Sequence, residues 1–424
     1  MSSSATATRT PAEPARQGNA FSLALFLATV LVLAVRICVT PAMLDGVYDY
    51  VREGGAFYEK IHLGSYLLVL LLPVALFSRP VFLRGEEIVK FRDLVRFTGL
   101  VGLLIAFIVG TGRTSAIGNL VDTYLVAGAA GLILLAQNPS YRRLAGDAVL
   151  LLCILSAAIG IFEAVTRIRI FDYVEGEDAF RPTGLAGHPL TLGLMCATAL
   201  AFVPLTSWKP WVKIAAMLLL FVATAAAGAR LALMVAVLEV LALLMLVPWR
   251  SLSPSAERKA KLGVLVLVLA GGAALLAILA AGGFLSRFGG GVVDQNFLAR
   301  TDIYGIYGLV GWRDILFGRD ITEITAIVTD KLGLPIIESS PVYFTFQLGA
   351  VLAVPFALLF FWFVWRLLRH QLRPAFIGTA VFLAVALSNN TMSQKTGVVT
   401  VLVVLLVAYL NAVPGERPVR RPQR

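Results

Sequence analysis

The sequence predicts an all-α polytopic membrane protein with about twelve transmembrane helices. Hydrophobic residues make up 58% of the 424 residues and charged residues only 14%, whereas soluble proteins are about 45–50% apolar and about 25% charged. Apolar runs long enough to cross a bilayer as helices recur along most of the chain. Lysine and arginine are concentrated in every second connection between these runs, which is typical of a membrane protein with a fixed orientation.

The chain begins with a short polar segment. Residues 1–18 are rich in Ser, Thr, Ala and Pro and contain no apolar core, so we expect a disordered cytoplasmic tail and no cleavable signal peptide. The transmembrane domain then occupies residues 19–413, and a basic cytoplasmic tail follows at 414–424. The predicted spans lie at about 20–40, 61–78, 98–112, 118–137, 148–166, 189–206, 211–228, 231–248, 262–283, 341–365, 374–388 and 397–413.

The cations that set the orientation follow the even-numbered spans. By the positive-inside rule these connections and both tails are cytoplasmic. The large loop at 284–340, between the ninth and tenth spans, is therefore predicted to be outside, and a loop of this length is usually functional. The cations concerned are Arg79, Arg84, Lys90, Arg92, Arg96, Arg142, Arg143, Arg250, Arg258, Lys259, Lys261, Arg366, Arg369, Arg373, Arg417, Arg420, Arg421 and Arg424.

Two arginines mark helix starts on the predicted outer side. Arg181 lies in a polar stretch that ends at Pro189, which suits the first position of a helix because its missing N–H leaves no helical bond unmade. A helix start offers free N–H groups and partial positive charge, so Arg181 beside it predicts an anion site. Arg230 has the same position relative to the next-but-one span.

The competing interpretation is that Arg181 and Arg230 only extend to lipid headgroups. Arginine is disfavoured at outer helix ends, however. Its planar guanidinium pairs bidentately with phosphate oxygens and keeps its proton. We therefore predict that the two arginines bind a lipid-linked pyrophosphate.

Two further residues are candidates for proton transfer. His188 directly precedes Pro189, where a histidine is more often a helix cap than a base, so both roles stay open. Glu338 lies at the end of the large loop, three residues before Pro341. It either complements the helix dipole at the start of the tenth span or places a carboxylate near the two arginines.

Acidic residues also lie inside or near the spans. A charged side chain near the middle of a membrane costs about 2.5–3.5 kcal/mol, so each needs a partner or a watery cavity. Glu163 is four residues before Arg167, and we expect these two to pair. Asp122 and Glu239 have no predicted partner, and we expect Arg36 to extend to the headgroups.

No cofactor or metal is predicted. The three cysteines fall in apolar runs without disulfide or metal-ligand spacing. The sequence has no His/Cys/Asp cluster of metal-ligand spacing, no phosphate-binding glycine loop and no nucleophile elbow. The net charge of +11 follows the membrane orientation and comes without a basic–aromatic surface pattern, so no nucleic-acid partner is predicted.

The motifs, in this order, resemble those of the bacterial O-antigen ligase/polymerase family. Arg181-Pro182-Thr183-Gly184 followed by His188-Pro189 resembles the family's first arginine motif. Gly228-Ala229-Arg230-Leu231 is similar to its second. Arg300 through Tyr304, Trp312 and Leu316-Phe317-Gly318 are similar to the pattern that opens the family's large periplasmic loop, so the resemblance covers roughly residues 150–360.

The resemblance implies a glycosyltransferase of the bacterial inner membrane with a periplasmic active face. Its donor would be a glycan on undecaprenyl pyrophosphate, which Arg181, Arg230, Arg300 and Arg313 would bind. Ligases of the family pass the glycan to lipid A–core and have a histidine near the end of the large loop. This loop contains no histidine, and Glu338 stands at the nearest position.

That departure favours a polymerase, which passes the glycan to a second lipid-linked unit, with Glu338 or His188 as the catalytic base. A flippase and a chain-length regulator would be its partners in polysaccharide assembly. The alternative function is transport or flipping of an anionic lipid-linked or small solute. A transporter would place its binding groups near the middle of the membrane, between inverted repeats, whereas the candidate residues here cluster at one face.

Overall fold

The computed structural model describes residues 14–410 except 51–56, 79, 82, 84, 113–116, 172–179, 249–252 and 282–300, and its regular structure is helical throughout that part of the chain. Five helices are long and apolar enough to cross a membrane, and several shorter apolar helices accompany them. The chain is thus an all-α, multi-pass membrane protein. The five are Ala20–Cys38, Glu86–Gly110, Ile117–Leu135, Pro139–Thr166 and Ala350–Leu368.

Where the structure describes them, the predicted spans coincide with helix. The helices are α1 (Pro14–Cys38), α3 (Leu63–Phe77), α4 (Glu86–Gly110), α5 (Ile117–Asn119) continued by η3 (Leu120–Leu125) and α6 (Val126–Leu135), α7 (Pro139–Thr166), α8 (Pro189–Phe202) with η5 (Val203–Leu205), α9 (Pro210–Ala226), α10 (Arg230–Leu246), α11 (Pro254–Ala281), α15 (Ser340–Leu348) with α16 (Ala350–Leu368), α17 (Arg373–Leu387) and α18 (Val398–Ala408). The count of twelve crossings stays a prediction.

Several boundaries differ from those predicted. Helix α1 begins at Pro14, inside the tail expected at 1–18, whereas residues 1–13 and 414–424 lie outside the described part of the chain. The tenth span, expected at 341–365, is broken at Gly349, whose φ of +79° ends α15 and starts α16. A Cβ at Gly349 would lie 2.4 Å from the carbonyl carbon of Phe317, so this turn needs glycine.

The helix formed by α5, η3 and α6 is the centre of the bundle. It is buried along almost its whole length and packs against α3, α4 and α18. Its glycines allow α4 to approach closely, since a Cβ at Gly131 would lie 2.6 Å from Leu94 Cδ2. The segment η3 is a π-helix, a rare local widening that often marks functional sites.

At one end of the bundle, the connections predicted to be cytoplasmic meet one another. Arg142 Nη2 lies 2.7 Å from Glu87 Oε1, and Arg366 Nε lies 2.7 Å from Asp93 Oδ2. Arg373 Nη1 donates to the carbonyl oxygen of Leu246 at 2.6 Å. These contacts join α4 to α7 and α16, and α10 to α17, so we call this the basic end. The charge pattern therefore grouped these helix ends correctly.

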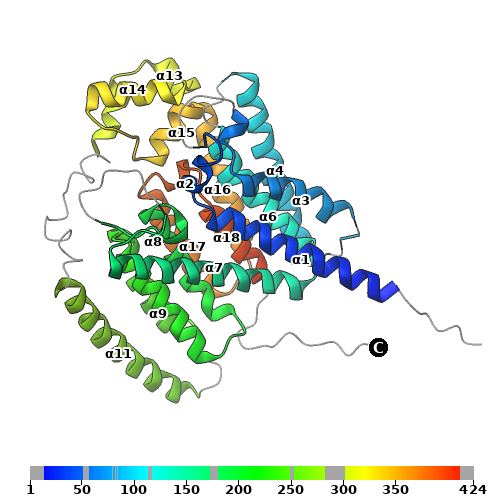
Figure 1. Cartoon of the computed structure of the whole chain (residues 1–424), viewed down its shortest axis with the longest axis vertical. Helices are drawn as coiled ribbons and strands as arrows, with labels where there is room; N and C mark the ends of the chain where they lie inside the picture. The colour runs from blue at the N-terminus through cyan, green and yellow to red at the C-terminus, as the bar shows by residue number, and fades with distance from the viewer. Residues whose placement is uncertain are drawn as a thin grey trace, which may run out of the picture.

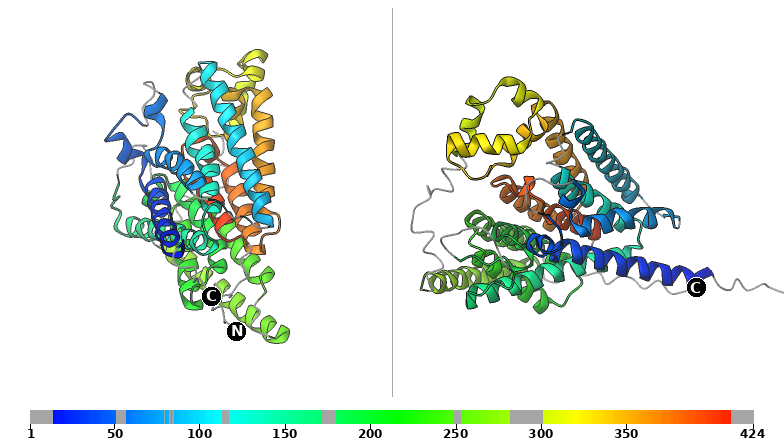
Figure 2. Two further views of the ribbon diagram at one scale, coloured as in Figure 1. Left: turned by 90° about the vertical axis from the view of Figure 1, so that its right-hand side faces the viewer. Right: turned by 45° about the horizontal axis from the view of Figure 1, so that its top comes forward.

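The opposite, or far, end carries a small helical cap. It consists of η7 (Ile303–Gly308), α13 (Trp312–Phe317), α14 (Ile321–Leu332) and α15, at the top of Figure 1 and again at the top of both views in Figure 2. The second half of the loop predicted at 284–340 is thus folded around an apolar core of its own. The buried residues of that core are Ile303, Ile306, Ile321, Ile324, Val328, Ile337, Val342 and Phe346.

Candidate functional site

Arg181 lies against the turn that precedes Arg230. The Arg181 side chain is only 8% exposed, and its Nε donates to the carbonyl oxygen of Ala227 at 3.1 Å. Gly228 has a φ of +65°, and a Cβ there would lie 3.5 Å from Arg181 Nε. Arg230 is the first residue of α10, three residues after the carbonyl that Arg181 binds. The fold therefore brings both predicted arginines to one turn, which we call the arginine turn.

Glu163, which lies in α7, stabilises the loop that carries Arg181. Its buried carboxylate accepts hydrogen bonds from the backbone N–H groups of Thr183 (2.8 Å), Gly184 (2.9 Å) and Ile170 (3.1 Å). We had expected Arg167 as the partner of this carboxylate, but the contacts found for it are with the backbone. Glu163 thus fixes the loop that carries Arg181, and its charge is stabilised by three donors.

A third arginine supports the loop from the other side. Arg169 donates through Nη2 to the carbonyl oxygen of Arg181 at 3.2 Å, and its guanidinium lies 5.0 Å from the ring centre of Phe180. Several cations therefore gather around the loop before α8. An anion bound there would meet both guanidinium charge and a helix start.

His188 is the N-cap of α8. Its Nδ1 accepts the backbone N–H of Leu190 at 3.1 Å, and Pro189 occupies the first helical position. The capping interpretation of this histidine therefore has direct geometric support. Nδ1 as acceptor leaves Nε2 as the protonated nitrogen of the neutral ring.

We expect His188→Ala to lower the stability of the protein by about 0.5–2 kcal/mol, the range for loss of a helix cap. His188→Asn should restore most of that loss, because asparagine is also a good N-cap. Thermal unfolding of both purified variants in detergent measures this difference. A variant with Asn that is stable but inactive would instead identify His188 as a proton-transfer residue.

Glu338 is half-buried just before α15, where the cap joins the membrane domain. The next-but-one residue, Ser340, donates to the carbonyl oxygen of Asn389 at 3.0 Å and lies 3.3 Å from Ser393 Oγ. This places Glu338 beside the connection between α17 and α18 at the far end. The arginine turn lies at the same end of the helices, but no contact joins it to Glu338 among those the structure gives.

The other two predicted phosphate-binding arginines are not brought to this site. Arg300 lies outside the described residues. Arg313 is exposed on α13, which packs against α15 and α16. In Figure 1, α13 lies at the top of the molecule, and α8 and α9 lie well below it. A role for either arginine in pyrophosphate binding stays a prediction.

A second polar cluster, which the sequence did not predict, surrounds Asp122 in the π-helix. The fully buried carboxylate accepts hydrogen bonds from Tyr50 OH (2.8 Å), Ser65 Oγ (2.6 Å) and the backbone N–H of His62 (3.0 Å). Arg36 donates through Nη2 to the carbonyl oxygen of Asp122 at 2.8 Å. We call these residues the aspartate centre. Arg36 is therefore turned inward, and our expectation that it extends to the headgroups was wrong.

Two further side chains, His62 and Lys395, complete the surroundings of the aspartate centre. The His62 ring bonds on both sides to backbone groups. Its Nδ1 accepts the N–H of Gly64 at 2.9 Å, so Nε2 donates to the carbonyl oxygen of Val39 at 3.0 Å. Burial lowers the pKa of Lys395 to about 8. That ammonium donates to the carbonyl oxygen of Tyr50 and lies 4.5 Å from the centre of its ring.

The arginine turn and the aspartate centre both lie next to the short stretch of chain at residues 39–41. His62 bonds to Val39, and a Cβ at Gly187, next to the arginine turn, would lie 2.8 Å from Pro41 Cδ. Both clusters therefore lie at the far end, on either side of the segment between α1 and α2 (Pro41–Asp45). The sequence did not predict the aspartate centre as a cluster. It did show Asp122 and Arg36 as charged residues inside apolar runs, which is the signal that could have found it.

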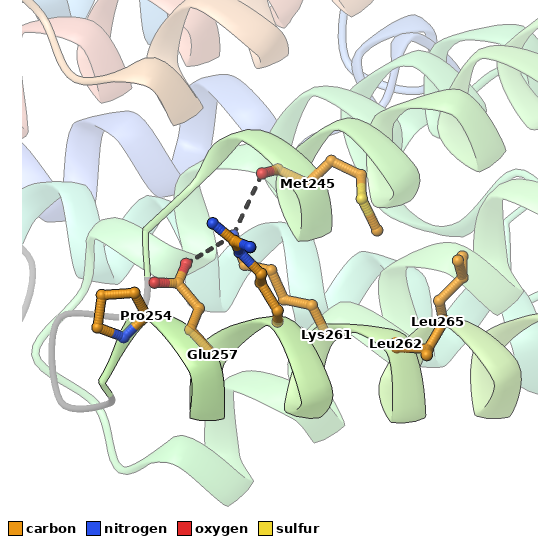
Figure 3. A pocket seen from close by; sticks show the side chains of 7 residues that line it. Met245, Pro254, Glu257, Lys261, Leu262 and Leu265 are labelled. Carbon is orange, nitrogen blue, oxygen red and sulfur yellow. Dashed lines mark hydrogen bonds and ion pairs between the residues drawn. The ribbon is translucent and has the colours of Figure 1, made fainter.

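Two of the cavities in the described part of the chain lie at opposite ends of the bundle. The larger, about 500 Å³, lies between α10 and α11 at the basic end, where Lys261 bonds to Glu257 (2.8 Å) and to the carbonyl oxygen of Met245 (3.2 Å), as Figure 3 shows. The smaller, about 200 Å³, is at the far end beside Ser340 and is mostly apolar. Its lining includes Tyr124, Pro341, Phe344, Phe356, Phe360 and Met392. Of these two, the smaller adjoins the start of α15, near Glu338.

In the described part of the chain, no group of three or more His, Cys, Asp or Glu side chains is placed to hold a metal ion. Comparison of the chain with protein-family models, with curated protein sequences and with solved structures gives no match. The function must therefore be inferred from the site itself.

Proposed function

We propose that this protein is a membrane glycosyltransferase that takes its glycan from an undecaprenyl-pyrophosphate donor at the periplasmic face of a bacterial inner membrane, and that it acts as a polysaccharide polymerase. The observation that carries the proposal is the arginine turn. A buried arginine and a second arginine at a helix start converge on one turn, at the end of the bundle opposite the basic end. Such a site suits a pyrophosphate anchored in the bilayer by its lipid.

The reaction needs no nucleotide sugar. An acceptor hydroxyl oxygen attacks the anomeric carbon of the donor, and the bond from that carbon to the pyrophosphate oxygen breaks with inversion. The bonding pair stays on the pyrophosphate, where the guanidinium groups of Arg181 and Arg230 stabilise the growing negative charge. The hydroxyl proton passes to a base, for which Glu338 is our first candidate and His188 the second.

Sidedness gives the first test of this proposal. We expect cysteines placed at the exposed positions Lys331 and Ser255, in a chain without its three native cysteines, to respond oppositely to an impermeant maleimide. Lys331→Cys in the cap should react in cells whose outer membrane is permeabilised. Ser255→Cys at the basic end should react only after the inner membrane is opened. The reverse pattern would place the arginine turn in the cytoplasm and contradict the proposal.

We expect Glu338→Gln to lower turnover by at least about tenfold, since general-base assistance is worth about 10²–10⁴-fold. Glutamine keeps the shape of the side chain and removes its charge and basicity. Glu338→His should recover part of the activity if the role is proton transfer. The measurement is polymer formation from purified lipid-linked repeat units in detergent, with donor binding followed in parallel. Full activity of the Gln variant would leave His188 as the candidate base.

The same purified system tests the proposal as a whole. Polymer formation from the lipid-linked donor alone, without added nucleotide sugar, is the expected result. The alternative, transport of an anionic lipid-linked or small solute, is favoured by one observation, the buried acids Asp122 and Glu239 inside apolar helices. Movement of the donor across proteoliposome membranes without bond formation would favour that alternative.

A further inference from the structure

The cavity of about 500 Å³ between α10 and α11 lies at the basic end, away from the residues proposed for glycan transfer. Its lining comes from one side chain of α10, Met245, and from side chains in the first half of α11. Small-molecule sites have volumes of about 300–1,000 Å³, so this cavity is large enough for a ligand. The proposed transfer reaction does not use it.

The side chains of α11 that line the cavity form one stripe along the helix. They are spaced by three or four positions, so they share a face. The stripe begins with the charged residues Glu257, Arg258 and Lys261 and continues with Leu262 and Leu265. Figure 3 shows Glu257 and Lys261 near the start of α11 and the two leucines further along it. Because α11 begins at the basic end, the charged part lies at the level of the lipid headgroups and the apolar part lies deeper in the membrane.

The charged part of the stripe favours an anion. Lys261 Nζ lies 2.8 Å from Glu257 Oε1 and donates to the carbonyl oxygen of Met245 at 3.2 Å, which uses two of its three N–H groups. Arg258 is exposed and brings five further donors. Arg373 of α17 adds another cation at the end of α10, where it donates to a backbone carbonyl. The start of α11 contributes the partial positive charge of a helix N-terminus.

The apolar part of the stripe continues onto a surface that faces the bilayer. Helix α11 packs against α10 and lies at the edge of the molecule in Figure 1. Its residues Leu262, Val266 and Leu269 follow one another at helical spacing and are 61%, 59% and 58% exposed. A lipid acyl chain that enters the cavity can therefore continue along α11 without leaving an apolar environment.

We propose that this cavity binds an anionic phospholipid from the leaflet at the basic end, which the charge pattern predicts to be cytoplasmic. The lipid phosphate accepts hydrogen bonds from Arg258 and from the Lys261 ammonium, and one acyl chain lies along Leu262 and Leu265 beside Met245. Basic pockets between transmembrane helices on the cytoplasmic side are known sites for anionic lipid headgroups.

Other occupants match only part of the stripe. A free phosphate ion would pair with the cations and leave the leucines uncovered, whereas an apolar helix of a second copy would cover the leucines and leave the cations without an anion. A phospholipid matches both parts, and it would join α11 to α10. The proposal does not depend on the transfer reaction, because the arginine turn lies at the opposite end of the bundle.

Photo-crosslinking of the full chain in lipid nanodiscs tests the proposal. The nanodiscs consist of phosphatidylcholine with a small fraction of phosphatidylglycerol that has a photoreactive group in one acyl chain, and peptide mass spectrometry locates the labelled residues. We expect labelling of the peptides that contain Met245, Leu262 or Leu265. Phosphatidylcholine with the same photoreactive chain, at the same fraction, should label these peptides much less, because its headgroup has no net charge.

Two neighbouring cations of α11 give a matched pair of variants. We expect Arg258→Gln to lower the phosphatidylglycerol labelling about fivefold, which corresponds to about 1 kcal/mol for one cation beside an anionic headgroup. Lys259→Gln removes an exposed cation that does not line the cavity and should leave the labelling unchanged. Both positions are exposed, so both variants should fold. Equal labelling by the two lipids, or an equal loss in the two variants, would show only a general surface attraction and overturn the proposal. Cross-links at these residues to a second copy of the chain would overturn it equally.

Discussion

Arg181→Ala and Arg230→Ala are each expected to lower glycan transfer by about 10²–10³-fold, the loss typical of removing one preorganised donor to a transition-state anion. Arg181 bonds to the arginine turn and Arg230 begins the helix that follows it, so neither can replace the other without moving the backbone. The measurement is polymer formation from purified lipid-linked repeat units. Lys331→Ala, which removes an exposed cation of the cap, is the matched control and should retain full activity.

Lysine should restore little of this activity at either position. It supplies a point charge, whereas a pyrophosphate oxygen pair is matched by the planar fork of arginine. Arg181 also bonds to the carbonyl oxygen of Ala227, so its loss could act by loosening the turn. Thermal unfolding measured beside activity separates the two effects. An inactive variant with an unchanged unfolding temperature supports anion binding, whereas parallel losses of stability and activity would assign Arg181 a structural role.

Asp122→Asn is expected to have the largest effect on stability, about 3–5 kcal/mol, the range for leaving a buried charge uncompensated, here that of Arg36, which bonds to the backbone carbonyl of Asp122. The carboxylate accepts three hydrogen bonds and stands beside Arg36, which is 3% exposed. Asparagine would leave the Arg36 charge uncompensated in the bundle interior. The checks are the yield of monodisperse protein and its unfolding temperature in detergent. Asp330→Asn, at an exposed position of the cap, is the control and should behave as the unmodified chain.

A double-mutant cycle sharpens this prediction. If charge compensation is what Asp122 provides, Arg36→Gln combined with Asp122→Asn should be less destabilising than the sum of the single changes. Additive losses would show that the hydrogen bonds of Asp122, and not its charge, stabilise the bundle.

The helices were predictable from the sequence because apolar runs of sufficient length have few alternatives to a membrane span. Their ends were less predictable. The sequence placed the start of the third span at 98, but α4 begins at Glu86, because Asp93 and Lys90 find partners at the end of α16, more than 270 residues away. No local pattern encodes such partners. The break at Gly349 likewise depends on the backbone of Phe317, which a distant segment of the loop supplies.

The candidate site was likewise predictable from the sequence only in part. Arg181 and His188 could be singled out because a polar stretch before a proline signals a helix start. That Arg181 would bind Ala227, 46 residues away, could not. Asp122 and Arg36 were visible as charges in apolar runs, but their mutual contact and the hydrogen bonds from Tyr50 and Ser65 exist only in the folded bundle. The π-helical turn that carries Asp122 has no recognised sequence signal.

The burial of the helix formed by α5, η3 and α6 also affects how the chain folds during synthesis. One face of this helix is covered by α18 and the segment before it. The hydroxyl of Thr123 donates to the carbonyl oxygen of Gln394 (2.6 Å), and that of Tyr124 donates to the carbonyl oxygen of Met392 (2.7 Å). During synthesis from the N-terminus, Tyr124 and Thr123 are made 268 and 271 residues before these partners. A nascent chain must therefore hold this helix in lipid, or against the insertion machinery, until α18 arrives. Insertion of α18, more than any earlier step, is then the event that closes the bundle.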